Sequence, residues 1–393
     1  MSTDVTTAAQ AVRTALARAG EGLLEREALL QAIALAAVAG EHVLVIGPPG
    51  TAKSEAVRRF TGAIGGTCFE YLLGRFTEPS EIFGPVDLRK LRDGVVETRT
   101  DGMLPEADVA FLDEVFQGST AILNTLLGIL NERRFRRGQA TITCPLRLCV
   151  AASNALPEDE ALAAFGDRFL LRLFVEPIGD TMLEDLLTAG WSLRGGSAPT
   201  ESATLADLDL LSRAVRDVDL ETVRPELATA VRLLRGVGLT LSDRRVIKLQ
   251  GLVAAACVLD GRSTATTADL WPLVFAVPTA PEQALARDTL APLLEGSSNT
   301  SLPDAAEAAS RGLLARSGRL ARQADELLQV EPGPDVEREA WVLQLESVLR
   351  EIDATFASAK LPAELDDLRG RLVAKVGGSD DDGTRAAPLG QDG

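Results

Sequence analysis

The chain has 393 residues, of which 46% are hydrophobic, 25% charged and 4% aromatic. This composition is typical of globular proteins, and the length predicts two or three domains whose cores need no disulfides. A net charge of −17 argues against a large non-specific surface for nucleic acid. No apolar run approaches the roughly 20 residues that span a bilayer and no signal-like segment opens the chain, so we expect a cytoplasmic protein.

Cysteine and histidine chemistry is limited. The four cysteines include no C-x-x-C pair, and Cys144 and Cys149 lie in or near an apolar run, which favours buried thiols over half of a zinc site. His42 is the only histidine and stands at the start of a predicted strand, so we expect a structural role. Catalytic Ser-His-Asp triads and His-ligated metal sites are thereby excluded.

Residues 15–180 alternate apolar, strand-like runs with helical patterns, which predicts an α/β fold built from βαβ units. Residues 1–14 are expected to be an N-terminal tail. The first, third and fourth runs are continuously apolar, as expected for central parallel strands covered on both faces. The expected strands are residues 42–47, 68–73, 108–114, 146–153 and 169–177.

Two hairpins are expected to interrupt this domain. Residues 89–104 contain two Asp-Gly turn signals, and residues 133–148 turn at Gly138 and then alternate as a strand does. Hairpins inserted in an α/β core usually present loops to a partner or a pore, although a plain surface excursion is the alternative.

The rest of the chain is predicted to be helical. Residues 181–285 form one helical domain, and a Pro- and Ser-bearing stretch marks its end. Residues 286–376 contain three amphipathic segments, which predict a three-helix bundle. An extended helical arm that packs only in an oligomer is the alternative. Residues 377–393 are predicted to be a disordered tail.

The stretch GPPGTAKSE follows the first predicted strand and precedes a helical pattern. It matches the phosphate-binding loop G-x-x-x-x-G-K-[ST] except at Ala52, where the second glycine is expected. The backbone N–H groups and the helix N-terminus would face phosphate, Lys53 would add a formal charge, and the Ser54 hydroxyl suits Mg²⁺. The candidate nucleotide-binding residues are Gly47, Pro48, Pro49, Gly50, Thr51, Ala52, Lys53, Ser54 and Glu55.

Ala52 leaves two interpretations of this loop. A Cβ at a position that requires positive φ costs about 1–2 kcal/mol, whereas a methyl group is the least obstructive replacement if glycine serves close approach. The loop is therefore either a working site with a tolerated methyl group or a chance match.

A second stretch, DVAFLDEVF, places Asp113 and Glu114 at the end of an apolar strand. This is the Walker B pattern, in which Asp113 would hold Mg²⁺ and Glu114 would orient the attacking water. An acidic N-cap before the next helix is the alternative. Two motifs in this order, each at the carboxyl end of a strand, favour the nucleotide site.

Two further polar residues stand near strand ends. Asn154 ends the fourth predicted strand, where its side chain can reach the γ-phosphate or the lytic water. Arg168 precedes the last strand and is either a surface partner of Asp167 or an arginine finger for a neighbouring subunit's site. Arg172 is a weaker candidate because it alternates along the strand itself.

The stretch LSDRRVIKL opens a helix with Arg244 and Arg245 in its first turn. Cations are unfavourable at a helix N-terminus, so the pair indicates an anionic partner, with a solvated pair as the alternative.

Taken together, these stretches resemble the AAA+ ATPases and, within them, the MoxR family, closest to the RavA-type subgroup. The resemblance covers about residues 15–285 and is carried by GPPGTAKS, LDEVFQGSTAILNTLLGILNERRFRRG, VAASNALP, DRFLLRL and SDRR. It implies a doubly wound αβα domain with a parallel sheet and an all-helical lid, assembled as a homo-oligomeric, usually hexameric, ring with ATP at the subunit interfaces. RavA-like proteins also carry a β-rich insertion in their C-terminal bundle, and residues 303–376 hold no strand-rich segment of that size.

The resemblance also implies roles for single residues and segments. The two hairpins match insertions that tend to face the ring's pore, and residues 21–36 match the segment beside the adenine. The implied catalytic and binding assignments are Lys53 and Ser54 for phosphate and Mg²⁺, Asp113 and Glu114 for Mg²⁺ and water, Asn154 as sensor 1, Arg168 as the finger and Arg244 as sensor 2, acting in its own or a neighbour's site.

The implied function is a Mg²⁺-ATP-dependent remodelling or assembly chaperone that hydrolyses ATP and acts on protein clients with a von Willebrand factor A-domain partner. The alternative is a nucleotide-gated scaffold with slow, incidental hydrolysis. A DNA motor is disfavoured by the acidic balance and by the lack of an aromatic and basic binding platform.

Overall fold

The structure is a computed structural model that describes residues 3–92, 96–137, 140–179, 182–192, 202–311, 313–329, 336–356 and 361–377. The chain divides into two compact units, unit 1 (Met1–Ser310) and unit 2 (Arg311–Gly393). Within the ranges described, no helix is both long enough and apolar enough to cross a membrane.

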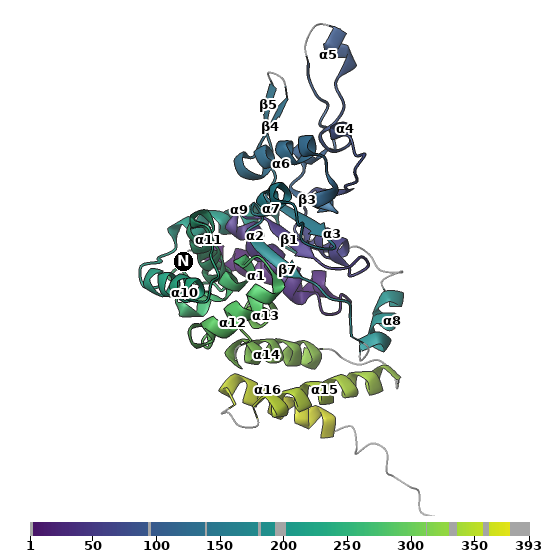
Figure 1. Cartoon of the computed structure of the whole chain (residues 1–393). Coiled ribbons are helices and arrows are strands. Elements are labelled where there is room, and N and C mark those ends of the chain that lie inside the picture. The colour runs from purple at the N-terminus through teal and green to yellow at the C-terminus, as the bar shows by residue number, and fades with distance from the viewer. Residues whose placement is uncertain are drawn as a thin grey trace, which may run out of the picture. The chain divides into compact units, whose positions relative to one another are not determined.

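A five-stranded parallel sheet forms the centre of unit 1 (Figure 1). In sheet order the strands are β2 (Cys68–Leu72), β3 (Val109–Asp113), β6 (Leu148–Ser153), β1 (Val43–Ile46) and β7 (Leu171–Phe174). In this order β1 lies between β6 and β7. After β1 the chain continues to β2 at one edge of the sheet, and after β6 it passes β1 to form β7 at the other edge. The carboxyl end of β1 therefore lies at a topological switch point, where open α/β sheets bind their ligands.

Helices cover both faces of this sheet. On one face, α6 (Thr120–Glu132) shares a buried apolar cluster with β1, β3 and β6. On the other, α2 (Glu27–Ala39) contacts β6 and β7, and α3 (Lys53–Ala63) contacts β3. This double cover explains the continuous apolar runs of the central strands. The expected αβα architecture and its five strands are confirmed.

The N-terminal segment differs from the prediction of a tail at residues 1–14. Thr3–Gly20 forms helix α1, which contacts α3 and α9 (Leu205–Ala214). Val5, Ala8 and Val12 are buried on one face at helical spacing. Small apolar residues in this pattern are enough to dock a helix, although they form no long apolar run.

One of the two expected hairpins is confirmed. β4 (Arg134–Arg137) pairs antiparallel with β5 (Ala140–Thr143), and the predicted turn at Gly138 lies outside the described residues. The other hairpin is supported only at its base, where an isolated antiparallel bridge joins Val86 to Thr98. Leu88–Arg92, expected in its first strand, forms a short helix, α5, and the predicted turn at residues 93–94 lies outside the described residues. The Asp87 carboxylate accepts hydrogen bonds from the N–H groups of Arg89 and Lys90, so a side-chain cap favours the short helix α5 over an extended strand here.

The two insertions are joined at their bases. The rings of Phe83, at the end of α4 (Pro79–Phe83), and Phe135 stack 5.5 Å apart, and Arg137 donates to the Gly84 carbonyl at 3.4 Å. Figure 1 shows both insertions extending away from the sheet in the same direction.

A helical region follows β7 within unit 1. Its central helix, α11 (Asp243–Leu259), contacts α2 and the 3₁₀ segment η7 (Trp271–Ala276), so this region packs on the N-terminal helices. The other α-helices of unit 1 are α7 (Glu160–Gly166), which precedes β7, and α8 (Leu183–Ser192), α10 (Arg224–Gly236), α12 (Ala280–Leu294) and α13 (Pro303–Ser310), which follow it.

In its described part, unit 2 consists of α14 (Leu313–Gln329), α15 (Val336–Thr355) and α16 (Ala363–Gly377). Leu320, Trp341 and Leu345 are among the buried residues of its core, which confirms the predicted helical bundle. The bundle starts later than the expected residue 286, which lies inside α12, because α13 packs on α2 and η7 of unit 1. The predicted tail after Gly377 lies outside the described residues.

Candidate nucleotide-binding site

The loop between β1 and α3 lies at the carboxyl edge of the sheet. Gly47 is buried, and a Cβ there would lie 2.2 Å from the carbonyl oxygen of Val175, so only glycine fits against the end of β7. Gly50 has a φ of 81°, which glycine adopts without a steric penalty. Pro48, Pro49 and Gly50 are exposed, so the outer face of the loop is accessible to a ligand.

Ala52 adopts the left-handed conformation that the missing glycine would have supplied, with φ 57° and ψ 25°. Its carbonyl accepts a hydrogen bond of 3.0 Å from the N–H of Ala56 and so starts α3. A non-glycine residue in this region costs about 1–2 kcal/mol. Glu114 is also left-handed, with φ 49°, so backbone strain occurs at two candidate positions.

Lys53 is held inside the loop and is only 6% exposed. Its Nζ donates to the carbonyl oxygens of Gly47 at 2.7 Å and Pro48 at 2.8 Å. Burial lowers the pKa of Lys53, while the charges of Asp113 and Glu114 act in the opposite direction. An ammonium has three N–H donors, so two are used within the loop and the side chain retains capacity for an anion. This donor set fits a phosphate group.

The acidic pair and Asn154 lie at the same edge of the sheet as the loop. β6 stands between β1 and β3, with Ser153 opposite Ile46 in the register. Asp113, the last residue of β3, accepts a hydrogen bond of 3.0 Å from the Glu114 N–H. Asn154, directly after β6, is exposed. The fold therefore brings together the loop, the acidic pair and Asn154.

The first turn of α3 holds the other two candidate ligands. Ser54 is partly exposed, and its hydroxyl accepts from Arg58 at 3.3 Å. Glu55 forms ion pairs with Arg58 at 2.7 Å and Arg59 at 2.9 Å on its own helix. Glu55 is thus engaged on the helix surface, whereas the Ser54 hydroxyl sits beside Lys53 at the helix N-terminus.

Arg26 is a residue of this site that the sequence reasoning missed. It is 5% exposed, and its guanidinium donates to the carbonyls of Thr51 at 2.9 Å and Glu176 at 2.8 Å. Burial lowers its pKa, and the neighbouring Glu25 and Glu27 oppose that shift. Arg26 therefore ties the phosphate-type loop to the segment after β7. The one available signal was a lone arginine within the otherwise apolar and acidic residues 21–36.

Arg168 lies at the opposite edge of the sheet from this loop. It precedes β7, whose first residue Leu171 pairs with Val43, the first residue of β1. A four-residue strand separates the two edges by about 13 Å. The structure therefore does not bring Arg168 to the loop of its own chain. Arg168 is partly buried, and its Nε has no hydrogen-bond partner among the described residues.

The other candidate arginines also lie away from the loop. Arg244 is exposed and donates to Asn131 Oδ1 at 2.6 Å, at the end of α6. Arg172 is buried and donates to the Pro278 carbonyl at 3.0 Å, and its burial and the charge of Arg245 lower its pKa to about 10. Arg172 is therefore an internal residue.

The expected structural role of His42 is confirmed. It is 3% exposed, and its Nδ1 accepts a hydrogen bond of 3.0 Å from the N–H of Cys149. Burial and the charge of Arg133 lower the pKa of His42 to about 3, so the imidazole is neutral. Burial raises the pKa of the Cys149 thiol to about 12, as expected for an unreactive strand cysteine.

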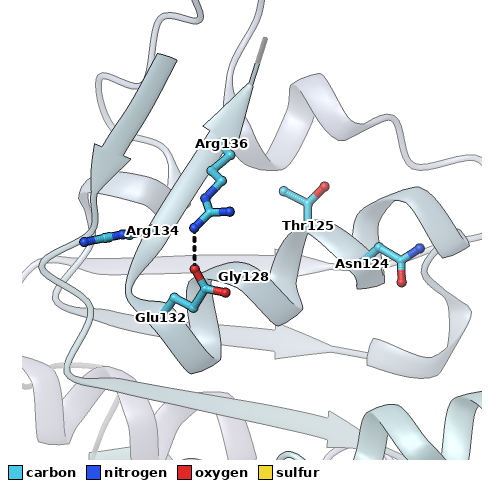
Figure 2. A pocket seen from close by; sticks show the side chains of 6 residues that line it. All are labelled: Asn124, Thr125, Gly128, Glu132, Arg134 and Arg136. Atoms are coloured by element: carbon cyan, nitrogen blue, oxygen red, sulfur yellow. Dashed lines mark hydrogen bonds and ion pairs between the residues drawn. The ribbon is translucent and has the colours of Figure 1, made fainter. Parts of the chain in front are cut away.

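A separate hollow of about 280 Å³ lies between α6 and β4. Figure 2 shows its lining, in which Arg136 bonds to Glu132 at 2.7 Å. None of the loop residues lines it, so it is distinct from the candidate nucleotide site. The lining residues are Asn124, Thr125, Gly128, Glu132, Arg134 and Arg136.

Known proteins are similar to this chain in sequence. Residues 10–213 match the family model described as the MoxR domain in MoxR-vWA-beta-propeller ternary systems. An uncharacterized protein from Methanocaldococcus jannaschii is 35% identical over 248 residues, which are 63% of this chain and 66% of that protein. The chain thus spans less than two thirds of this relative's length. The chaperone MoxR1 of Mycobacterium tuberculosis is 27% identical over 157 residues, 39% of this chain and 41% of MoxR1.

A solved structure supports the fold. The crystal structure of a candidate ATPase from Cytophaga hutchinsonii superposes with a TM-score of 0.62 and covers 75% of this chain and 97% of that chain. The two sequences are 14% identical, so this likeness concerns the fold alone.

Proposed function

Because this chain belongs to the family of MoxR domains from MoxR-vWA-beta-propeller ternary systems, we propose that it is a Mg²⁺-dependent, ring-forming AAA+ ATPase that remodels protein clients. In this proposal residues 15–180 form the nucleotide-binding core and residues 181–285 form a helical lid.

The observation that carries the proposal is the environment of Lys53. A buried ammonium faces two loop carbonyls and lies within the electrostatic influence of Asp113 and Glu114. A cation between a helix N-terminus and two carboxylates suits a phosphate chain whose charge is shared between lysine and a metal. Ser54 and Asp113 would hold that metal, and Mg²⁺ bound there would neutralise charge developing on the phosphate oxygens.

Glu114 and Asn154 complete the proposed chemistry at the same edge of the sheet. Glu114 follows Asp113 directly and has a left-handed backbone, a strained conformation of the kind found at functional sites. Glu114 would orient and polarise the attacking water, and Asn154 would contact the γ-phosphate or that water. Nucleotide binding needs only the metal ligand Asp113, whereas hydrolysis also needs a second carboxylate, Glu114, to act on water.

Arg168 and Arg244 support a ring. Both lie at the amino edge of the sheet, away from the loop of their own chain. An arginine finger at that edge can serve only a nucleotide bound to a neighbouring copy, and such a finger contributes roughly 10³–10⁵ in rate. We therefore propose that Arg168 acts in trans, that Arg244 also faces the neighbouring nucleotide, and that the ring is hexameric.

The partner follows from the family. Since the matching domains occur with von Willebrand factor A-domain and beta-propeller proteins, we propose that such proteins connect the ring to its clients. A RavA-type placement within the family rests on the sequence motifs alone. The described residues of unit 2 are helical, so a RavA-like β insertion is not among them.

Steady-state ATPase rates test the proposal directly. The rate per subunit should rise with protein concentration, since each site needs a neighbour. Glu114→Gln should bind ATP but lose at least about 10²-fold in turnover, and Arg168→Ala should assemble normally and lose about 10³-fold. Glu346→Gln, at a solvent-accessible carboxylate of α15 paired with Arg350 at 3.0 Å, is the matched control and should retain the parent rate.

The opposite outcomes are equally specific. A Glu114→Gln variant that hydrolyses ATP as fast as the parent would overturn the hydrolytic mechanism. Nucleotide-dependent assembly with no turnover above that variant, even with the von Willebrand factor A-domain partner added, would indicate the scaffold instead.

A further inference from the structure

Arg245 is buried at a position that is unfavourable for a cation. It lies in the first turn of α11 and is 2% exposed, although the helix dipole disfavours positive charge there. Four hydrogen bonds to other elements offset this cost. Its Nε donates to Asp167 Oδ1 at 2.6 Å, Nη1 to the carbonyls of Leu170 at 3.0 Å and Ala276 at 2.6 Å, and Nη2 to that of Phe169 at 2.9 Å.

Three of these four acceptors flank Arg168. Asp167 precedes it, and Phe169 and Leu170 follow it. The N–H of Arg168 itself donates to the Phe165 carbonyl at 3.0 Å, at the end of α7. The backbone that carries Arg168 is therefore held by α7 on one side and by α11 on the other.

The pairing leaves Arg168 and Asp167 with different tasks. Adjacent residues of opposite charge would ordinarily be taken as partners, but the Asp167 carboxylate bonds to Arg245. Because the Asp167 carboxylate pairs with Arg245 and not with Arg168, the charge of Arg168 remains available for a group outside this segment. Buried ion pairs add little net stability, so strength of folding alone does not account for this arrangement.

We propose that Arg245 and Asp167 are a positioning pair, which fixes Arg168 for the neighbouring subunit's nucleotide and makes its position depend on the lid helix α11. The inference rests on the proposed function, in which Arg168 acts in trans. A displacement of about 1 Å at a reacting centre can cost about 10²-fold in rate, so a pair that holds the finger's backbone controls turnover without contacting ATP.

Asp167→Asn tests the pair at its accessible member. The Asp167 side chain is 39% exposed, so the change removes charge without emptying the core. We expect kcat to fall about 10- to 100-fold while KM for ATP stays within twofold, because the ATP loop lies at the other edge of the sheet. Asp209→Asn is the matched control. Its side chain is 41% exposed and bonds to Arg147 at 2.8 Å, and both constants should stay within twofold.

A subunit-mixing experiment separates positioning from general damage. Glu114→Gln subunits have an intact Arg168 but no lytic activity of their own. Mixed with Asp167→Asn subunits before ATP is added, they should raise the ATPase rate per Asp167→Asn subunit at least threefold, because they present a correctly placed Arg168 to sites with intact Glu114. A role in the local fold or in the subunit's own site would not be relieved in this way.

The same mixing experiment with Arg168→Ala subunits distinguishes failure of the positioning pair from failure of the trans arginine finger. Rescue of Arg168→Ala by Glu114→Gln, without rescue of Asp167→Asn, overturns the positioning pair and leaves the trans finger intact. Rescue of neither overturns the trans finger itself. An unchanged kcat for Asp167→Asn also overturns the pair, whatever the mixtures do.

Arg245→Lys provides a second route to the same question. Lysine keeps the charge but cannot span four acceptors with a planar fork. Its kcat should fall as in Asp167→Asn and should be rescued by the same mixture. If circular dichroism shows this variant unfolded, Asp167→Asn alone decides the outcome.

Discussion

Arg26 and Thr51 are joined by a hydrogen bond of 2.9 Å from a buried guanidinium to the carbonyl of the residue before the left-handed Ala52. The same guanidinium reaches the Glu176 carbonyl, so the curvature of the loop is set from outside the loop. Two hydrogen bonds that restrain the loop reduce the ordering cost of binding a ligand there.

Arg26→Lys should weaken ATP binding. Lysine keeps the charge but lacks the planar fork that reaches both carbonyls, so at least one buried hydrogen bond is lost. We expect the Kd for a fluorescent ATP analogue to rise about tenfold, which a direct titration measures. Arg18→Lys, at an exposed arginine bonded to Ser202, is the control and should leave Kd unchanged. Equal affinities for both variants would show that the loop holds its shape without Arg26.

Ala52→Gly should stabilise the fold slightly without improving the site. Glycine removes the left-handed strain at φ 57°, although the added freedom of the unfolded chain offsets part of the gain. We expect unfolding free energy to rise by at most about 1 kcal/mol and ATP affinity to change by less than about threefold. Urea unfolding and nucleotide titration measure the two quantities.

Ala56→Gly is the control for that substitution. Ala56 is buried inside α3, so glycine there should destabilise the protein by about 1 kcal/mol or more. A gain of tenfold or more in the ATP affinity of Ala52→Gly would mean that the methyl group impairs the site.

The sequence pattern alone predicted which polar residues lie at the carboxyl edge of the sheet. Strands buried on both faces must be apolar, so polar residues at their carboxyl ends stand out, as Asp113, Glu114 and Asn154 do. Lys53 follows a glycine-bearing turn between a strand and a helix, and only a few local structures place a lysine there. Topology then brings these residues to one edge without further information.

The sequence could not predict hydrogen bonds to backbone carbonyls or contacts between residues far apart in the chain. Arg26 bonds to carbonyls 25 and 150 residues away, and a carbonyl acceptor leaves no mark in the sequence. Asp167 bonds to Arg245, 78 residues away, rather than to its neighbour Arg168. The tail expected at residues 1–14 failed for a different reason, because an alanine-rich face packs well without the large apolar residues that mark a core helix.

Lowering the pH from 7 to 5 should destabilise unit 1 through His42. Its pKa in the folded state, about 3, lies below the unfolded value of about 6.5, so the unfolded state binds the proton more readily. Stability is therefore lost as pH falls from 6.5 towards 3, and His42 contributes no slope above that range. Linkage gives a loss of about 2 kcal/mol between pH 7 and pH 5.

Urea unfolding at pH 7, 6 and 5 measures this loss, and His42→Asn is the comparison. Asparagine can still accept from the Cys149 N–H but does not titrate, so the variant should be less stable at pH 7 yet show a flatter pH slope. Parallel slopes for the parent and the variant would assign the acid sensitivity to other groups.

Leu345→Ala should destabilise unit 2 and leave unit 1 intact. Leu345 is fully buried among Trp341, Val348 and Ile352, and removing a buried leucine side chain usually costs about 2–5 kcal/mol. A three-helix unit of this size has a small free energy of unfolding. The variant's unit 2 should therefore unfold at a lower temperature than unit 1 in a thermal scan. ATP affinity should stay unchanged, because the candidate nucleotide-binding residues all belong to the unit that ends at Ser310.

Leu343→Ala on the same helix is the matched control, since that side chain is 61% exposed and its loss should shift neither transition by more than about 0.5 kcal/mol. A single, shared transition that moves with Leu345→Ala would contradict the division at residue 311, because it would mean that both units unfold as one. Two transitions, of which only the weaker moves, would show that the bundle folds on its own core while the nucleotide site keeps its stability.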